Sequence, residues 1–219
     1  MRVVKQAEER RNEILDAADE LFSEKGFDGT STNDILAKVG IARGTLYYHF
    51  KSKEDIMDAL IERYNAMLLQ AAKTAASNKS IPVYERIMSV VMALNISDHG
   101  AGQIMEHIHQ PQNALMHQKI QKVIIRDVPP ILSEIIEEGI EQQLFSTPYP
   151  YECMEMLLIY LNTIFDLHMI EMNDEIRLSR LEAFAFNTER LLGAPSGSLM
   201  SVISVMASGG SDVPKNSPK

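Results

Sequence analysis

Four ring-bearing side chains stand side by side in the first quarter of the chain, as Tyr47, Tyr48, His49 and Phe50. Basic residues flank them, and the window from Leu36 to Lys53 contains no Asp or Glu. Tyrosine and histidine combine hydrogen-bonding groups with flat apolar rings, which suit phosphates, sugar edges and thymine methyl groups. A buried helix would not need the cations, and an ordinary solvated face would not need four adjacent rings. The chemistry that this window favours is therefore binding to nucleic acid.

The overall charge limits that interpretation. The chain has 219 residues and a formal net charge of −9, which argues against indiscriminate binding to nucleic acid. The cations Lys38, Arg43, Lys51 and Lys53 are nevertheless gathered in the acid-free window. We therefore expect one locally positive surface on an acidic protein.

Short helices must position these residues. Apolar residues at helical spacing predict a first helix over residues 7–25, with Gly26 at the position of a C-cap. Ser31, followed three residues later by Asp34, resembles a capping box and predicts a short second helix that ends at Gly40.

A third short helix follows, in which Leu46 and Phe50 are four residues apart and should face inward. Ser52 can cap a long fourth helix over residues 54–76. Two short helices joined by the turn "VGIA" form a helix-turn-helix arrangement. In that motif the second helix enters the major groove of DNA, and the N-terminus of the next helix offers amides to a phosphate.

The resulting DNA-binding candidates share a place on the short helices or at the start of the fourth helix. They are Thr32, Arg43, Gly44, Thr45, Tyr47, Tyr48, His49 and Lys53.

The same residues resemble a known family. The stretch "GTSTNDILAKVGIARGTLYYHFKSKEDI" is similar to the DNA-binding signature of the TetR family, and "ILDAADELFSEKGFDGTS" resembles the segment that opens it. The resemblance covers about residues 10–60. Two positions depart from the family pattern: Val39 stands where a small Ala is usual, and Ala42 replaces a capping Ser or Thr. The second change removes a cap worth about 1 kcal/mol.

The resemblance implies a homodimer, a palindromic operator in double-stranded DNA and an all-α C-terminal domain with a pocket for a small-molecule inducer. In similar proteins, the ligand spreads the two DNA-binding heads and releases DNA. The last two helices usually form a four-helix bundle with those of the partner, so we expect the dimer interface within residues 150–193.

The rest of the chain shows helical patterns and no sustained period-two alternation, so we predict an all-α fold. Helices are expected over 83–95, 103–109, 113–143, 152–171 and 175–192, and Pro129-Pro130 should kink or interrupt the third of these. We predict a DNA-binding domain over 1–53 and a ligand-binding and dimerisation domain over 54–193. Residues 194–219 are expected to form a flexible tail around a small apolar patch from Leu199 to Met206.

An apolar or aromatic ligand site is predicted within residues 83–170, because pockets combine apolar walls with a few polar anchors. His107 and Tyr160 are the candidate anchors, each with ordinary packing as the alternative. The candidate lining residues are Met88, Met92, Ile104, His107, Met116, Ile120, Tyr160 and Phe165.

The histidines admit a second interpretation. His107 and His109, with His99 and His117 nearby, suggest ligation of a metal or haem. Residues i and i+2 of a helix point apart, however, so His107 and His109 would not share a site. We therefore predict polar lining or surface histidines, no metal and no cofactor.

The cysteine count and the hydropathy pattern indicate the cellular compartment. One cysteine, Cys153, excludes an intramolecular disulfide and a multi-thiolate metal site in one chain. The N-terminus has no apolar signal core, and no apolar run reaches membrane-spanning length. A cytoplasmic protein without membrane contact is expected.

Three classes of function remain open. The first is a ligand-responsive transcriptional repressor. The second is a ligand-independent protein that organises DNA, and an apolar cavity would argue against it. The third is an enzyme with a DNA-binding head, which is weakened because the sequence has no metal-ligand spacing, phosphate loop or nucleophile elbow.

Overall fold

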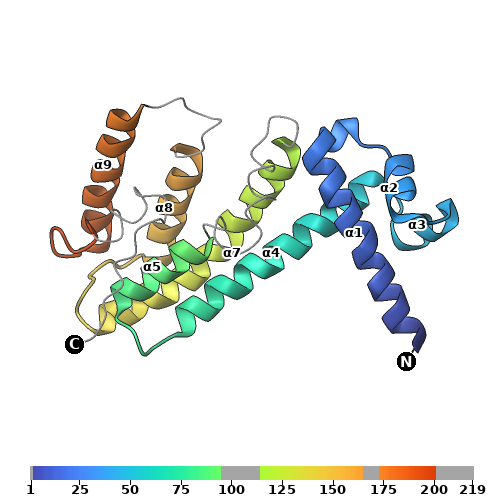
Figure 1. The fold of residues 1–219 in the computed structure, drawn as a ribbon. Coiled ribbons are helices and arrows are strands. Elements are labelled where there is room, and N and C mark those ends of the chain that lie inside the picture. The colour runs from blue at the N-terminus through green and yellow to red at the C-terminus, as the bar shows by residue number, and fades with distance from the viewer. Residues whose placement is uncertain (1, 95–113, 165–172, 201–219) are drawn as a thin grey trace, which may run out of the picture. The chain divides into compact units, whose positions relative to one another are not determined.

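The computed structural model describes residues 2–94, 114–164 and 173–200, and within these ranges every regular element is an α-helix (Figure 1). The predicted all-α fold class is confirmed. The helices are α1 (Arg2–Gly29), α2 (Thr32–Val39), α3 (Arg43–His49), α4 (Lys53–Ser77), α5 (Val83–Leu94), α7 (Ala114–Glu141), α8 (Pro150–Ile164) and α9 (Asp174–Leu192).

Two compact units share these helices. The first lies within residues 1–67 and 96–122, and it contains α1, α2, α3, much of α4 and the start of α7. The second lies within residues 68–95 and 123–219, and it contains the end of α4, α5, the rest of α7, α8 and α9. The long helices α4 and α7 therefore contribute residues to both units.

The core of the first unit comes from the apolar face that predicted its first helix. Ile14, Leu15 and Phe22 of α1 are buried, as are Ile56 and Leu60 of α4. The backbone leaves the helical region at Gly26 (φ 74°, ψ 166°), which is where the sequence predicted the end of the first helix. Burial of such side chains stabilises a fold by about 1.5–3 kcal/mol each.

Two ion pairs add to this packing. Arg63 of α4 donates from Nη1 to Oδ1 of Asp16 on α1 at 2.6 Å. Lys119, near the start of α7, pairs with Asp58 of α4. The first turns of α7 therefore belong to the same unit as the helix-turn-helix.

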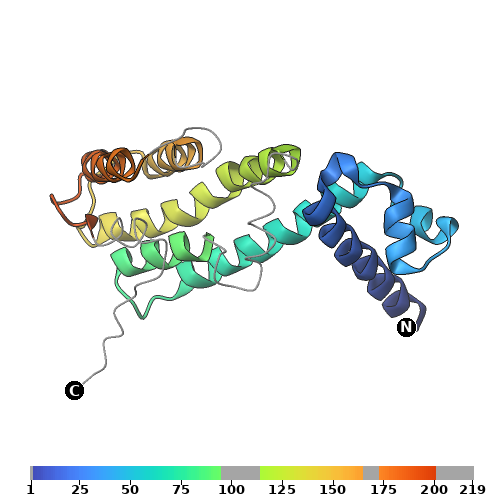
Figure 2. The ribbon, with the colours of Figure 1, turned by 45° about the horizontal axis from the view of Figure 1, so that its top comes forward.

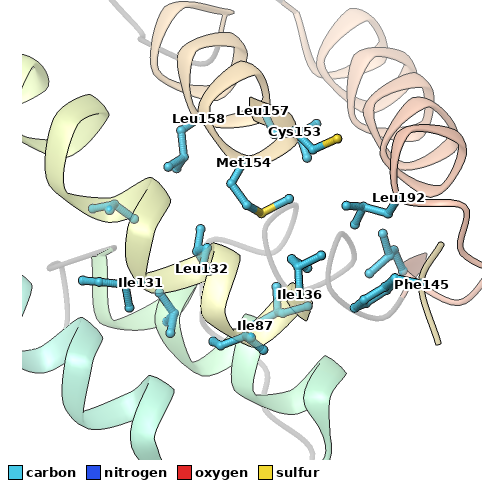
Figure 3. Packing of buried hydrophobic residues seen from close by; sticks show 14 of the residues in the cluster. Ile87, Ile131, Leu132, Ile136, Phe145, Cys153, Met154, Leu157, Leu158 and Leu192 are labelled. Carbon is cyan, nitrogen blue, oxygen red and sulfur yellow. The ribbon is translucent and has the colours of Figure 1, made fainter. Parts of the chain in front are cut away.

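The second unit has its own apolar core, in which α5, α7, α8 and α9 meet. Figure 3 shows Met154 of α8 pointing toward Leu132 and Ile136 of α7, with Ile87 of α5 nearby. Helices α8 and α9 lie side by side, as both ribbon views show (Figure 2). Apolar side chains at helical spacing on α8 and α9 supply much of this core.

Helix α7 runs unbroken through Pro129 and Pro130, so the prolines do not interrupt it. Each proline removes a backbone N–H from the helical ladder. Buried Val128, Ile131 and Leu132 hold the surrounding turns in the core, and this packing offsets the lost hydrogen bonds.

Some expected elements fall outside the described residues. These are the helix over 103–109, the end of the helix over 152–171 and most of the tail. Residues 194–200 of the tail are described, and Leu199 among them is buried.

Candidate nucleic-acid interface and ligand cavity

Helix α2 begins with the capping box that the sequence predicted. The Ser31 hydroxyl accepts a hydrogen bond from the Asp34 amide at 3.2 Å, and the Ser31 amide donates to the Asp34 carboxylate at 2.8 Å. The Ser31 hydroxyl also donates to that carboxylate, and Lys25 approaches it at 3.3 Å. These hydrogen bonds, those from Ser31 foremost, lower the pKa of Asp34 to about 2. Gly40 ends the helix in the left-handed conformation.

Helix α3 is positioned by its apolar side. Leu46 and Phe50 are almost fully buried, as predicted, and the Arg11 guanidinium lies over the Phe50 ring at 5.1 Å. The N-cap residue Ala42 is extended and makes no side-chain cap hydrogen bond. Packing of Leu46 and Phe50, rather than capping, therefore holds this short helix in place.

The opposite side of α3 presents the rings that the sequence singled out. Tyr48 is 79% exposed and Tyr47 is 47% exposed, while His49 is half-buried. The Tyr48 and His49 rings meet edge to face, with centroids 5.0 Å apart. A side chain at Gly44 would meet open space, so another molecule can approach the backbone there.

The cations of the window divide into two groups. Lys38 pairs with Glu20 of α1 at 2.5 Å, which neutralises it locally. Arg43 and Lys51 are exposed, and Arg43 donates to the side-chain oxygen of Asn33 at 3.0 Å. Thr32 is half-buried in the first turn of α2, and Thr45 is half-buried on α3.

Lys53 has a role that sequence reasoning missed. Its ammonium donates to the carbonyl oxygens of Phe27 at 2.6 Å and Thr30 at 2.9 Å, and it lies 4.1 Å from the centroid of the Phe27 ring. Lys53 thereby ties the start of α4 to the α1–α2 corner. An ammonium has three donors, so one remains for another acceptor. No local sequence signal points to carbonyl groups 23 and 26 residues away.

The candidate ligand residues are divided among the first unit, the second unit and the residues outside the described ranges. Met116 and Ile120 are buried in the first unit, whereas Met88, Met92 and Tyr160 belong to the second. Tyr160 is 38% exposed and stacks on Phe184 with centroids 5.6 Å apart. Ile104, His107 and Phe165 lie outside the described residues, as do His99 and His109. His117 is within hydrogen-bonding distance of Gln121, at 3.3 Å.

The second unit contains an apolar cavity of roughly 70 Å³. Its walls come from α5, α7, α8, α9 and the segment after α9, and Thr188 is the polar residue among the lining side chains. The lining includes Ile87, Leu132, Ile136, Met154, Phe184 and Leu199. None of these was a candidate from sequence. The apolar patch that begins at Leu199 was the available signal for the last of them.

Within residues 2–94, 114–164 and 173–200, no group of three His, Cys, Asp or Glu side chains gathers as a metal site would require. No helix in the same ranges is long and apolar enough to cross a membrane.

Comparisons with known proteins agree with this arrangement. Residues 14–60 match the family described as bacterial regulatory proteins, tetR family, and residues 96–187 match the tetracyclin repressor-like C-terminal domain. The transcriptional repressor KstR2 of Mycobacterium tuberculosis is 27% identical over 147 residues, which cover 66% of this chain and 73% of that protein.

Two further proteins extend the comparison. IcaR of Staphylococcus epidermidis, a negative transcriptional regulator of the biofilm operon icaADBC, is 30% identical over 125 residues, covering 51% of this chain and 68% of that protein. The structure of RolR in complex with resorcinol has the same fold, with a TM-score of 0.60 at 18% identity over 92% of this chain and 96% of that chain.

The exposed, ring-bearing α3 lies in a helix-turn-helix, and the described part of the other unit is wholly helical. Together with the matches above, this arrangement defines a DNA-binding transcriptional regulator. The chain belongs to the TetR family.

Proposed function

We propose that this regulator is a homodimeric repressor that binds a palindromic operator through α3 and is released from it by a small apolar or aromatic inducer. Its relatives KstR2 and IcaR are named as a repressor and a negative regulator. A protein that reads DNA in this way works in the cytoplasm.

One observation carries the DNA-binding part of the proposal. Tyr48 projects from a helix whose inner face is held by Leu46 and Phe50, so its ring can contact DNA without loss of packing. Tyrosine can donate a hydrogen bond to a phosphate or a base edge and can place its ring against apolar groups. Tyr47 and His49 extend this surface.

Four further residues complete the proposed contact. Arg43 and Thr45 place donors near the start of α3, and Gly44 permits a phosphate to approach the backbone. Thr32 lies in the first turn of α2. Lys53 contributes its third ammonium donor, with the other two held by main-chain carbonyls.

The proposed dimer uses the outer faces of α8 and α9. Met154, Leu157 and Leu181 of these helices are buried inside the chain. Other large apolar residues face outward: Met156, Ile159, Tyr160, Ile176, Leu178, Phe186 and Leu191. An apolar surface of this kind on one helix pair suits a self-complementary interface with a second copy.

The apolar cavity of the second unit is the proposed inducer site. Aliphatic side chains, Met154 and the Phe184 ring form the walls, and the Thr188 hydroxyl already donates to the Phe184 carbonyl. Such walls favour an apolar or aromatic ligand with few hydrogen-bonding groups. RolR, which shares the fold, was solved with the small aromatic resorcinol. Tyr160 stacks on the cavity residue Phe184 and stays a candidate anchor, as does His107.

Induction sets an energetic requirement. To move the DNA-binding state from 99:1 to 1:99, the inducer must prefer the released state by roughly 10⁴-fold, or about 5.5 kcal/mol. Linkage makes the effect reciprocal, so operator DNA must weaken inducer binding by the same factor.

The test begins with the DNA fragments that the purified protein selects from a genomic pool. Binding to the recovered operator is then compared for wild type, Tyr48→Ala and Tyr149→Ala, an exposed tyrosine of the second unit. We expect Tyr48→Ala to weaken binding by about 5- to 150-fold, which corresponds to about 1–3 kcal/mol. Equal affinity of Tyr48→Ala and wild type would overturn the proposed α3 contact.

The inducer is tested by calorimetry. Small apolar and aromatic compounds, with resorcinol as the first probe, are titrated into the protein with and without operator. We expect weaker binding in the presence of operator. A ligand that binds equally well in both titrations is not an inducer.

A further inference from the structure

The segment after α9 folds back onto the second unit. Gly193 ends α9 with φ 61°, and a Cβ added there would lie 2.0 Å from the Ser146 hydroxyl oxygen. Only glycine fits this close left-handed turn. The Ala194 amide then donates to the Glu189 carbonyl at 2.8 Å, which directs residues 194–200 back along the helix end.

Glu189 anchors this segment. Its carboxylate is buried and accepts two backbone hydrogen bonds, from Gly197 at 2.9 Å and from Leu199 at 3.0 Å. A buried carboxylate is costly unless its oxygens are bonded, and bonds to an ionised acceptor are stronger than neutral ones. The closed position of the segment and the burial of Glu189 therefore depend on each other.

The anchored segment places Leu199 in the wall of the apolar cavity. Leu199 is 3% exposed, and among the described residues that line the cavity it is the one that lies outside the helices. The other lining side chains cannot move far without disturbing α5, α7, α8 or α9. Leu199 can move when two hydrogen bonds to one carboxylate break.

The small volume of the cavity makes the movement of Leu199 important for ligand binding. A volume of roughly 70 Å³ is well below the roughly 150 Å³ of an engineered protein cavity that holds benzene. A ligand with an aromatic ring therefore needs more space than this pocket provides while Leu199 stays in its wall.

We infer that residues 194–200 form a latch over the apolar cavity, that Leu199 limits the size of its ligand, and that Glu189 holds the latch closed. This inference rests on the proposed inducer site. An apolar ring enters by displacing Leu199, and the amides of Gly197 and Leu199 lose their acceptor when it does so.

The first experiment measures the latch without any ligand. Hydrogen exchange at residues 194–200 is followed by mass spectrometry in wild type, Glu189→Gln and the matched variant Glu182→Gln, which changes an exposed carboxylate on the same helix. The glutamine amide replaces one acceptor with a donor, so we expect exchange of the latch amides to rise about tenfold in Glu189→Gln. Glu182→Gln should exchange like wild type. Equal exchange in Glu189→Gln and wild type overturns the latch.

The second experiment adds benzene as the probe. Leu199→Ala and Leu132→Ala each remove three carbon atoms from the cavity wall, one from the latch and one from α7. We expect both variants to bind benzene more tightly than wild type. In Leu132→Ala, where the latch is intact, bound benzene should speed exchange at residues 197–199. Benzene binding to Leu132→Ala without faster exchange there means that ligand enters elsewhere, and it overturns the latch as the gate.

The experiments distinguish failure of the proposed function from failure of the latch. If benzene binds the variants and opens the latch but never weakens operator binding, the latch stands and induction through this cavity does not. If no variant binds benzene, the cavity is not a ligand site and Leu199 has no role in ligand size.

Discussion

Helix α3 and the pair α8–α9 both expose large ring-bearing or aliphatic side chains, but the chemistry of the two surfaces differs. On α3 the exposed rings of Tyr47 and Tyr48 end in hydroxyl groups, and cations lie close by in the sequence. On α8 and α9 most of the large exposed side chains, such as Met156, Ile159 and Phe186, have no hydrogen-bonding group, and the exposed Tyr151 and Tyr160 are the exceptions.

The difference teaches what each surface can bind. Rings with polar tips suit a charged and hydrated partner such as DNA, where ordered water and phosphate contacts are common. Aliphatic side chains and phenylalanine gain only when another apolar surface removes them from water. Exposure alone would have grouped the two surfaces together, and the polar atoms separate them.

The largest expected effect comes from comparing a substitution on the buried side of α3 with one on its exposed side. Leu46→Ala should lower the free energy of unfolding by about 2–5 kcal/mol, because Leu46 is almost fully buried. Tyr48→Ala should change it by less than about 0.5 kcal/mol, because Tyr48 is mostly solvated. Urea denaturation followed by circular dichroism measures both. Similar losses in the two variants would mean that Tyr48 supports the fold.

The next effect concerns the apolar surface. Phe186→Glu places a charge where the proposed interface would bury it, and it should raise the dimer dissociation constant at least about 30-fold, or about 2 kcal/mol. Analytical ultracentrifugation at micromolar concentration is the measurement. Leu115→Glu, an exposed apolar residue of the first unit, is the matched control and should stay dimeric. A monomeric wild type would contradict the proposed interface.

A smaller effect is expected for Lys53→Ala, and it should appear in both DNA binding and stability. Lys53→Ala should weaken specific and non-specific DNA binding, with the salt dependence reduced by about one counterion. It should also lower stability by about 1–3 kcal/mol, because the carbonyl groups of Phe27 and Thr30 lose a donor.

Lys51→Ala separates the two roles, since Lys51 is exposed and should affect only DNA binding. Affinity and stability are measured over a range of salt concentrations. If Lys53→Ala lowers stability and leaves the salt slope unchanged, Lys53 stabilises the corner and does not contact phosphate.

The smallest effect is a pH dependence within the helix-turn-helix. Hydrogen bonds in the folded state lower the pKa of Asp34 from 3.8 to about 2. The ionised carboxylate therefore stabilises the fold above about pH 4, and that contribution is lost as the pH falls toward 2. Acid unfolding of wild type and Asp34→Asn can be compared by circular dichroism. We expect a shallower pH dependence for Asp34→Asn in this range, and identical curves would contradict the role of the capping box.

Local patterns predicted the DNA-binding part well. The Ser31–Asp34 capping box and the inward faces of Leu46 and Phe50 depend on residues three or four apart, so they can be read directly from the chain. The resemblance to the TetR family rests on the same stretch. The contacts of individual side chains with DNA stay predictions.

The predicted ligand site stays a prediction. Its candidates include Met88 and Met116, which belong to different units. The apolar cavity instead uses residues such as Leu132, Phe184 and Leu199, which come from three separate segments. An apolar residue on a helix has the same sequence signal whether it fills the core or lines a cavity.

By itself, the sequence determined the helical register of residues 31–50, the all-α class and the position of the ring-bearing surface. These follow from helical periodicity and from hydrogen bonds between near neighbours. Only the tertiary structure decided which side of α8 and α9 faces out, that Lys53 is held by the carbonyl groups of Phe27 and Thr30, and that Leu199 reaches the cavity. Each of these depends on segments distant along the chain, and their contact is set by the packing of the whole unit rather than by local spacing.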